Sequence, residues 1–306
     1  MTTREEINKK QADAIINQEK SEKRKKIIIF IFKLIVTILI IIVFFFLYIT
    51  YFSTKGLVVK ENRIINQKIP DSFNGTKIIQ FSDLHYGTTV FEKEIKDLVK
   101  VINSRNPDIV VFTGDLVDKN YNIVSSEQEL LTEYLKKIKS SIGKYAITGE
   151  EDDEKFNTIF NQSDFIILNN EYDLVYNNDN NPLLMIGLSS SLNNKRDNDK
   201  AYSYFREETH NSNIYSICLL HESDSIDDII SKYTTDLFLV GHSHNGQIIV
   251  PFIGAISKTN GSNKYYNDFY QLNNSKIFVS GGIGTNNNGI RLFNRPSINL
   301  FRLSNK

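Results

Sequence analysis

The sequence predicts an α/β domain of layered sheets and helices (α+β layered), preceded by a single N-terminal transmembrane helix. Three observations predict this fold class. Residues 34–52 carry no charge. Beyond them, short unbroken runs of Ile, Val, Leu and Phe recur, and segments with helical spacing separate some of these runs. Such runs are typical of strands buried on both faces, and their alternation with helices indicates sheets covered by helices.

Composition excludes several classes of protein. The chain has 306 residues, and 36 Lys and Arg balance 36 Asp and Glu, which disfavours a nucleic-acid binder that depends on overall basicity. The sequence also shows no basic patch interleaved with aromatic residues, which a nuclease would use to hold a nucleic-acid backbone. One cysteine excludes an intramolecular disulfide and a cysteine-based zinc site. The five histidines are therefore the residues to locate.

The N-terminal segment has the pattern of a membrane anchor. Residues 1–26 carry eight basic and five acidic side chains, and 27–52 are apolar apart from Lys33 and a few small or hydroxyl groups. The 19 uncharged residues 34–52 would span about 28 Å as a helix, close to the hydrocarbon thickness of a bilayer. A buried core helix is rarely apolar on every face, and residues 51–55 offer no signal-peptidase site. We expect a basic cytoplasmic tail (1–26), an uncleaved transmembrane signal anchor (27–52) in the cell membrane, and an extracellular remainder.

The elements of the remaining chain follow from its apolar runs. Residues 56–65 alternate and predict an edge strand. Helical spacing predicts helices over 91–104 and 127–143, the second closing with Gly143 as its C-cap. Eight further strands are expected at 76–81, 108–112, 145–148, 164–168, 183–187, 214–220, 236–240 and 276–280.

Asp and His residues directly follow several of these strands. They are Asp83 and His85, then Asp115 and Asp118 after a glycine, then His221, and finally His242 and His244. Each motif alone has an ordinary explanation, because Asp-x-His arises by chance, Asp often caps turns and a lone buried His is usually structural. Four of the five histidines nevertheless lie just beyond predicted strands, whereas His210 lies in a polar stretch and is expected to be solvent-exposed.

Together the motifs resemble the calcineurin-like metallophosphoesterase family, whose pattern runs D-x-H, G-D-x-x-D, G-N-H-[DE], a lone H and G-H-x-H. The resemblance covers about residues 57–306, and residues 241–248 resemble its membrane-linked branch, which includes bacterial phosphodiesterases and a UDP-diacylglucosamine pyrophosphatase. It implies a four-layer αββα sandwich with two divalent metal ions, Mn, Fe or Zn. By the same resemblance, one ion is bound by Asp83, His85 and His244, the other by His221 and His242, and Asp115 bridges them.

The third motif departs from the family pattern, because Gly149-Glu150-Glu151-Asp152 stands where G-N-H-[DE] is expected. Glu150 replaces the Asn ligand, and Glu151 replaces the His that donates a proton or positive charge to the phosphate. One extra charge at about 4 Å is an interaction of up to about 4 kcal/mol at an effective dielectric of 20, so phosphate attraction should weaken.

Three interpretations follow. Glu150 is a substitute ligand for a hard ion with Glu151 protonated or turned away, or the site hydrolyses slowly, or the domain is a non-catalytic binding module. Because every other ligand position is intact, our hypothesis is an active, atypical enzyme with Glu151 and Asp118 as candidate catalytic residues; we expect Asp118 to steady the loop or a His ligand. The resemblance implies hydrolysis of a phosphodiester or pyrophosphate by a hydroxide held between the ions, and the anchor favours a lipid-linked or cell-envelope substrate.

Overall fold

The computed structural model describes residues 3–193, 195–206, 213–256, 258–286 and 289–306. His210 lies outside these residues. The contacts within the chain divide it into two units, Met1–Ile49 and Thr50–Lys306. Each unit is described by itself.

The first unit is helical. Helix α1 covers Arg4–Leu47, and Tyr48–Phe52 continue it as a π-helical turn. None of the side chains of α1 is buried, and apolar residues such as Ile28 and Phe44 are exposed on a helix that is apolar from residue 27 onward apart from Lys33 and Thr37. Among the described residues, Arg4–Phe52 is the one helix long and apolar enough to cross a membrane, so it is a candidate membrane span.

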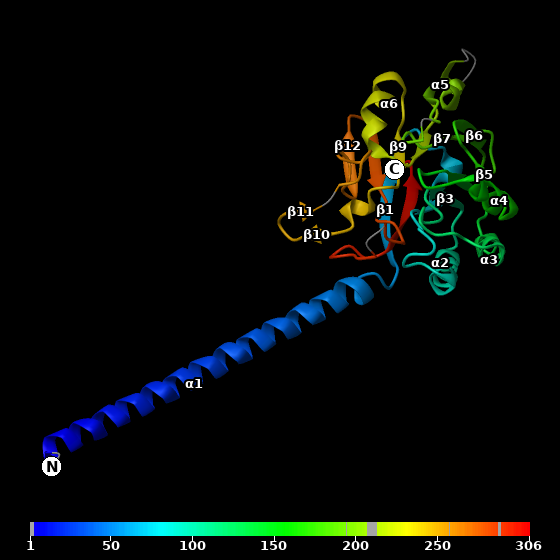
Figure 1. Ribbon diagram of the computed structural model, residues 1–306. Coiled ribbons are helices and arrows are strands. Elements are labelled where there is room, and N and C mark those ends of the chain that lie inside the picture. The colour runs from blue at the N-terminus through cyan, green and yellow to red at the C-terminus, as the bar shows by residue number, and fades with distance from the viewer. Residues whose placement is uncertain (1–2, 194, 207–212, 257, 287–288) are drawn as a thin grey trace. The chain divides into compact units, whose positions relative to one another are not determined.

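The second unit is built on two six-stranded sheets (Figure 1). In spatial order the first sheet contains β1 (Val58–Ile65), β14 (Ser297–Ser304), β2 (Lys77–Phe81), β3 (Ile109–Thr113), β4 (Gly143–Ile147) and β5 (Ile166–Ile167). The second contains β12 (Phe269–Leu272), β13 (Ser275–Val279), β9 (Leu237–Val240), β8 (Ser216–Leu220), β7 (Leu183–Gly187) and β6 (Glu171–Val175). A small hairpin pairs β10 (Ile249–Val250) with β11 (Gly254–Ala255).

Helices cover the outer faces of both sheets. Figure 1 shows α2 (Glu92–Ser104), α3 (Ser125–Lys136) and α4 (Glu154–Gln162) grouped together, and their buried side chains form one apolar core with the first sheet. A second core lies between the sheets, where Val111 and Phe301 belong to the same cluster as Leu219. A third joins the second sheet to α5 (Asn198–Ala201) and α6 (Ile226–Lys232). Three cores between four layers confirm the expected αββα sandwich.

Short 3₁₀ turns complete the described elements, at Asp71–Phe73, Ser203–Arg206, Ser223–Ser225 and His244–Gly246.

Two predicted elements differ in extent. The helix expected over 127–143 ends at Lys136, and Gly143 begins β4 instead of capping a helix. The reason is tertiary, because the Asn103 side chain donates to the Lys137 carbonyl and accepts from the Lys139 N–H. These bonds take the place of the helical ones. The strand expected over 164–168 pairs only at Ile166–Ile167. The edge strand expected over 56–65 is confirmed as β1, at the end of the first sheet.

The strand directions determine where the loops with the predicted site residues lie. In the first sheet β2, β3 and β4 are parallel neighbours, and in the second β8 and β9 are parallel neighbours. Parallel neighbours end at the same edge of a sheet, so the loops after β2, β3 and β4 lie side by side, as do those after β8 and β9.

Candidate metal centre

The predicted ligands lie on tight turns at the strand ends. Five of these non-glycine residues have left-handed backbones: Asp83 (φ 53°), His85 (41°), Asp115 (61°), His242 (65°) and His244 (48°). Such conformations are uncommon for residues with a side chain and cluster at functional sites. The turns therefore aim these side chains at one point at a conformational cost that the surrounding fold sustains.

Two glycines allow the loops to approach one another. Gly114 has φ 96°, and a Cβ there would lie 2.4 Å from His221 Nδ1 and 2.7 Å from the Gly149 nitrogen. A Cβ on Gly149 would lie 2.1 Å from Asp115 Oδ1. Only glycine fits at either position.

One donor set contains Asp83, His85 and His244, all buried. The Nε2 atoms of His85 and His244 are 3.1 Å apart, and His244 Nε2 is 3.5 Å from Asp83 Oδ1. A second set contains Asp115, Glu150, His221 and His242. His221 Nε2 lies 3.2 Å from Asp115 Oδ2 and 2.8 Å from Glu150 Oε2, and His242 Nδ1 lies 2.9 Å from Glu150 Oε1.

The two sets are adjacent. Asp115 Oδ2 of the second set is 3.8 Å from His85 Nε2 of the first. Asp83 accepts the backbone N–H of His242 at 2.9 Å, which joins the first sheet to the second. The structure thus brings together all seven residues that the sequence predicts as ligands.

Hydrogen bonds on the far side of two rings set which nitrogen faces the centre. His221 Nδ1 lies 2.6 Å from the Thr113 carbonyl, and His242 Nε2 lies 2.6 Å from the Asn260 carbonyl. Because a carbonyl only accepts, these nitrogens carry the protons, and His221 Nε2 and His242 Nδ1 are left as donors to a metal.

The electrostatics of the centre and its buried polar atoms without hydrogen-bond partners indicate that the donor sets fit cations. Burial would lower the pKa of His85 and His221, yet the surrounding carboxylates raise the pKa of His85 to about 9 and that of His221 well above its usual value. The carboxylates of the centre therefore favour positive charge at these two imidazoles. Among the described residues, Asp83 Oδ2, Glu150 Oε2 and His221 Nε2 are buried without a hydrogen-bond partner, although the last two are close together. Oxygen and imidazole atoms converging in this way suit divalent transition metals.

His244 differs from the other predicted ligands. Burial lowers its pKa to about 4, and the charges of His85 and Arg291 act in the same direction against that of Asp83. His244 is therefore a neutral imidazole at ordinary pH.

Glu151 lies beside the first donor set. Its Oε2 is 3.1 Å from His85 Nδ1 and accepts the Lys119 backbone N–H at 3.0 Å. The Lys119 ammonium is 3.6 Å from Oε1. Asp118 accepts from the Thr88 hydroxyl at 3.0 Å and from the Asn120 backbone N–H at 2.8 Å, so it links two loops beside the centre.

Two residues at the centre were given no role by the sequence. Asp152 accepts three backbone N–H groups at 2.8 Å, from Gly149, Asp115 and Leu116. Desolvation and the charge of Asp115 raise the pKa of Asp152 to about 7. The only sequence signal was its place in the third motif.

The second is Arg291, which has no exposed surface. It donates to the carbonyls of Gly281, Gly284 and Asn294, and its Nη2 lies 3.3 Å from His244 Nδ1. Burial lowers the pKa of Arg291 to about 10. A buried arginine in a tail rich in Gly and Asn has no local sequence signature.

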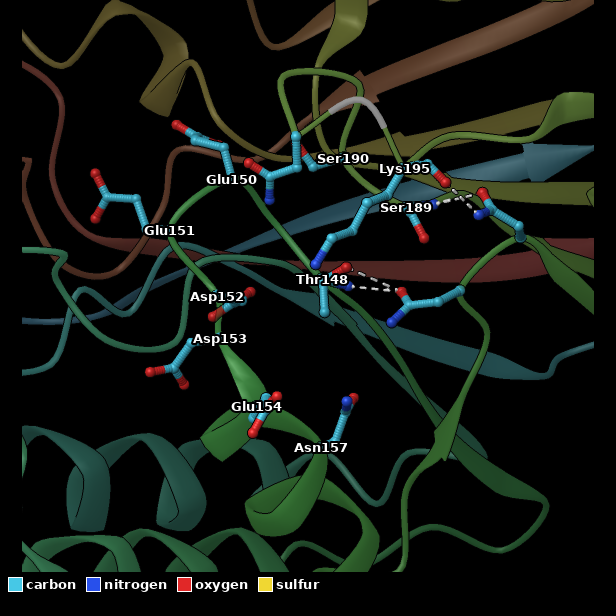
Figure 2. Close-up of a pocket in the computed structure, with 13 residues that line it drawn as sticks. Thr148, Glu150, Glu151, Asp152, Asp153, Glu154, Asn157, Ser189, Ser190 and Lys195 are labelled. Atoms are coloured by element: carbon cyan, nitrogen blue, oxygen red, sulfur yellow. Dashed lines mark hydrogen bonds between the residues drawn. The ribbon is translucent and has the colours of Figure 1, made fainter.

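A cleft of about 800 Å³ opens beside the second donor set. Figure 2 shows the run Glu150–Glu154 along one wall and Ser189, Ser190 and Lys195 on another. The wall also carries Asn157, Asn169, Asn170 and Asn193. The cleft is therefore rich in hydroxyl, amide and carboxylate groups.

Two facing sheets with a centre of His and carboxylate ligands at their strand ends define the metallophosphoesterase class that the sequence predicts. Residues 76–246 match the family model described as Calcineurin-like phosphoesterase, and the chain belongs to this family. Its members are hydrolases of phosphate esters that use divalent metals.

The chain is similar to several known proteins. The chain is 29% identical to the uncharacterized metallophosphoesterase YkuE of Bacillus subtilis over 84% of this chain and 88% of that protein. It is 30% identical to an uncharacterized metallophosphoesterase of Aquifex aeolicus, over 84% and 94%. The chain is 24% identical to the UDP-2,3-diacylglucosamine pyrophosphatase LpxG of Chlamydia trachomatis, over 61% of this chain and 70% of that protein. A crystal structure of the calcineurin-like phosphoesterase YfkN of Bacillus subtilis aligns with TM-score 0.37 and 13% identity, over 66% and 87%.

Proposed function

We propose that this protein is a membrane-anchored, metal-dependent phosphodiesterase. The observation that carries the proposal is the convergence of seven side chains from five strand-end loops into two adjacent donor sets. Asp83, His85 and His244 would hold one divalent ion, Mn, Fe or Zn. Asp115, Glu150, His221 and His242 would hold the other, with Asp115 between the two.

Divalent ions held by these residues would lower the pKa of a water molecule and offset the negative charge that develops on a phosphoryl group. The chain's own groups prepare the site for this chemistry. The Thr113 and Asn260 carbonyls hold the His221 and His242 rings in the orientation that ligation needs. The left-handed turns at Asp83 and His85 fix the other set.

Glu150 contributes as a ligand and not as a base. Its two oxygens lie 2.8 Å from His221 Nε2 and 2.9 Å from His242 Nδ1, so Glu150 would share one ion with these two imidazoles. It adds one negative charge to the centre, which reduces the attraction for a phosphate group. The buried Arg291 guanidinium, next to His244, offsets part of this charge.

Glu151 positions His85. With His85 Nδ1 bonded to the Glu151 carboxylate, His85 Nε2 faces the first donor set. Glu151 stands at the family position that supplies a proton to the leaving group, and here it orients His85 instead. We therefore expect substrates with leaving groups of low pKa, which depart without a proton donor, to react fastest. Asp118 steadies the neighbouring loop through Thr88 and Asn120.

The cleft favours a phosphodiester over a pyrophosphate. Asp153 and Glu154 on its wall oppose a second anionic group, whereas Ser189, Ser190 and Asn193 can hydrogen bond an uncharged polar one. We further propose a lipid-linked or cell-envelope substrate, because Arg4–Phe52 can anchor the chain in a membrane. By the excess of basic residues in 1–26, that tail is cytoplasmic, 27–52 spans the cell membrane and the phosphoesterase domain, 57–306, is extracellular.

The test is an assay of the full-length protein in a mild detergent. Aryl and alkyl phosphodiesters, phosphomonoesters and a pyrophosphate are compared with Mn²⁺, Fe²⁺, Zn²⁺ and no metal. We expect metal-dependent turnover of the aryl phosphodiester, reduced by at least about 100-fold in Asp115→Asn, since that carboxylate serves both donor sets. Absence of turnover with every metal, or an unchanged rate in Asp115→Asn, would sink the enzyme proposal and leave a binding module.

A double substitution separates two explanations of the acidic pair. If Glu150 and Glu151 only weaken a standard family site, Glu150→Asn with Glu151→His raises the rate. If the pair holds the ligands as described above, the double variant loses activity and metal together. Metal content by elemental analysis distinguishes loss of metal from loss of chemistry.

A further inference from the structure

The hairpin β10–β11 carries an unusual set of exposed apolar side chains. Phe252 and Ile253 lie at its tip and are 109% and 78% exposed, and Ile256, just after it, is 64% exposed. Phe293 is 58% exposed. From Ser53 onward, these four are the most exposed large apolar side chains in the described part of the chain.

Phe293 belongs to the same face as the hairpin. The Ile249 N–H donates to the Leu292 carbonyl at 2.9 Å, and Ile248 pairs with Leu292. Ile249 and Phe293 line one hollow of about 650 Å³. None of the four exposed side chains joins the three apolar cores formed by the described residues. A cluster of this kind on a protein surface marks a site of interaction.

Positive charge and the course of the chain indicate the occupant. Lys60 and Arg295 line the same hollow as Ile249 and Phe293. The Arg295 guanidinium donates to the Lys55 carbonyl at 3.4 Å. Lys55 follows Phe52, the last residue of the apolar span, by three residues, so the chain alone keeps Lys55 within about 10 Å of the end of that span.

Exposed aromatic and aliphatic side chains flanked by Lys and Arg are the groups that bind a bilayer surface. A protein partner would need a matching apolar surface, whereas the bilayer that holds the anchor is already within reach. Lys60 is paired at 2.6 Å with Asp268, which also lines the hollow, so Arg295 supplies the net positive charge there.

We propose that the hairpin docks on the membrane that carries the chain's own anchor. Phe252 and Ile253 enter the boundary between headgroups and acyl chains, and Lys60 and Arg295 lie against lipid phosphates. The hairpin lies in the sequence between His244 and Asn260, whose carbonyl bonds His242. Docking would therefore bring the segment that joins the hairpin to His244 close to the membrane, whatever reaction the centre catalyses.

The test uses the full chain in vesicles of phosphatidylcholine and phosphatidylglycerol that contain a nitroxide-labelled lipid. Cys218 is buried and is replaced by Ser. An environment-sensitive fluorophore is attached at Ile253→Cys, an exposed position where the change should not affect folding. The matched control is Asn180→Cys, in the loop before β7, at the opposite edge of its sheet from the loops that carry His221 and His242. The positive control is Phe52→Cys, at the end of the span.

We expect the probe at 253 to emit at shorter wavelength than the probe at 180 and to lose emission to the nitroxide lipid as the probe at 52 does. Phe252→Ser should reduce that loss, and Arg295→Gln should reduce it more in vesicles rich in phosphatidylglycerol. Quenching at 52 without quenching at 253 overturns the proposal. The proposal also fails if the emission at 253 moves to shorter wavelength without quenching by the nitroxide lipid and the shift grows with protein density. That result would place the hairpin against another copy of the protein. Since no readout depends on turnover, failure here is distinct from failure of the proposed enzyme activity.

Discussion

At the scale of single residues, Asp152 links the loop after β3 to the loop after β4. Its carboxylate accepts N–H groups from Gly149 in one loop and from Asp115 and Leu116 in the other. Replacement by Asn turns one oxygen into an NH₂ group that faces a backbone donor. We expect Asp152→Asn to lower the free energy of unfolding by about 1–3 kcal/mol, the cost of an unsatisfied N–H group, and to reduce bound metal.

Urea denaturation and elemental analysis measure these two effects. The neighbouring Asp153→Asn is the matched control, because Asp153 caps α4 by accepting the Lys155 N–H and Asn caps equally well. Equal stability and metal content in Asp152→Asn and Asp153→Asn would show that Asp152 does not hold the two loops together.

Sequence and structure agree unevenly at this scale. The grouping of the predicted ligands could be expected because each follows an apolar run, and parallel strands end at a common edge of a sheet. Their assignment as metal ligands came from the resemblance to the family. The contact of Glu151 with His85 was not predictable. It depends on where the loop after β4 passes the loop after β2, and the pattern of residue types does not encode that path.

At the scale of elements, the strands were predictable where apolar runs are buried on both faces, as in β3 and β8. The position of β14 was not, because it inserts between β1 and β2, more than 200 residues earlier in the chain. The end of α3 was missed for a similar reason, since the Asn103 side chain that ends it belongs to α2.

Helix α2 provides a test of pH dependence. Glu94 accepts from Lys55 at 2.7 Å and from the Phe91 N–H at 3.2 Å. Partial burial would raise the pKa of Glu94, but these bonds hold it below its usual value of 4.5. An acid whose pKa is lowered by folding stabilises the fold above that usual value, and the contribution is lost as pH falls through the folded pKa.

We therefore expect Glu94→Gln to lower the free energy of unfolding by about 1 kcal/mol or less at pH 7, because Lys55 is half exposed and screened. The difference from the unmodified protein should shrink below pH 4. Thermal melts across pH 3–7 measure it. A difference that is constant over that range would exclude the ionised pair as its cause.

At the scale of the whole molecule, the centre joins the two sheets. Asp83 and Asp115 come from the first sheet, and His221 and His242 come from the second. Buried carboxylates and imidazoles face one another there, and the carboxylates raise the pKa of His85. Anything that binds between the sheets should therefore stabilise the sandwich as a unit.

We expect each bound ion of Mn²⁺, Fe²⁺ or Zn²⁺, at about 100 times its dissociation constant, to stabilise the folded state by about 2.7 kcal/mol, which corresponds to a rise in Tm of about 5–10 °C per ion for a domain of this size. The measurement compares melts of the full chain with metal and with chelator at matched ionic strength. Asp115→Asn should lose most of the rise, because its carboxylate serves both donor sets. Asp228→Asn, on the exposed face of α6, should keep it. An equal rise in both variants would mean that the metals act elsewhere on the protein, and the assignment of the centre would fail.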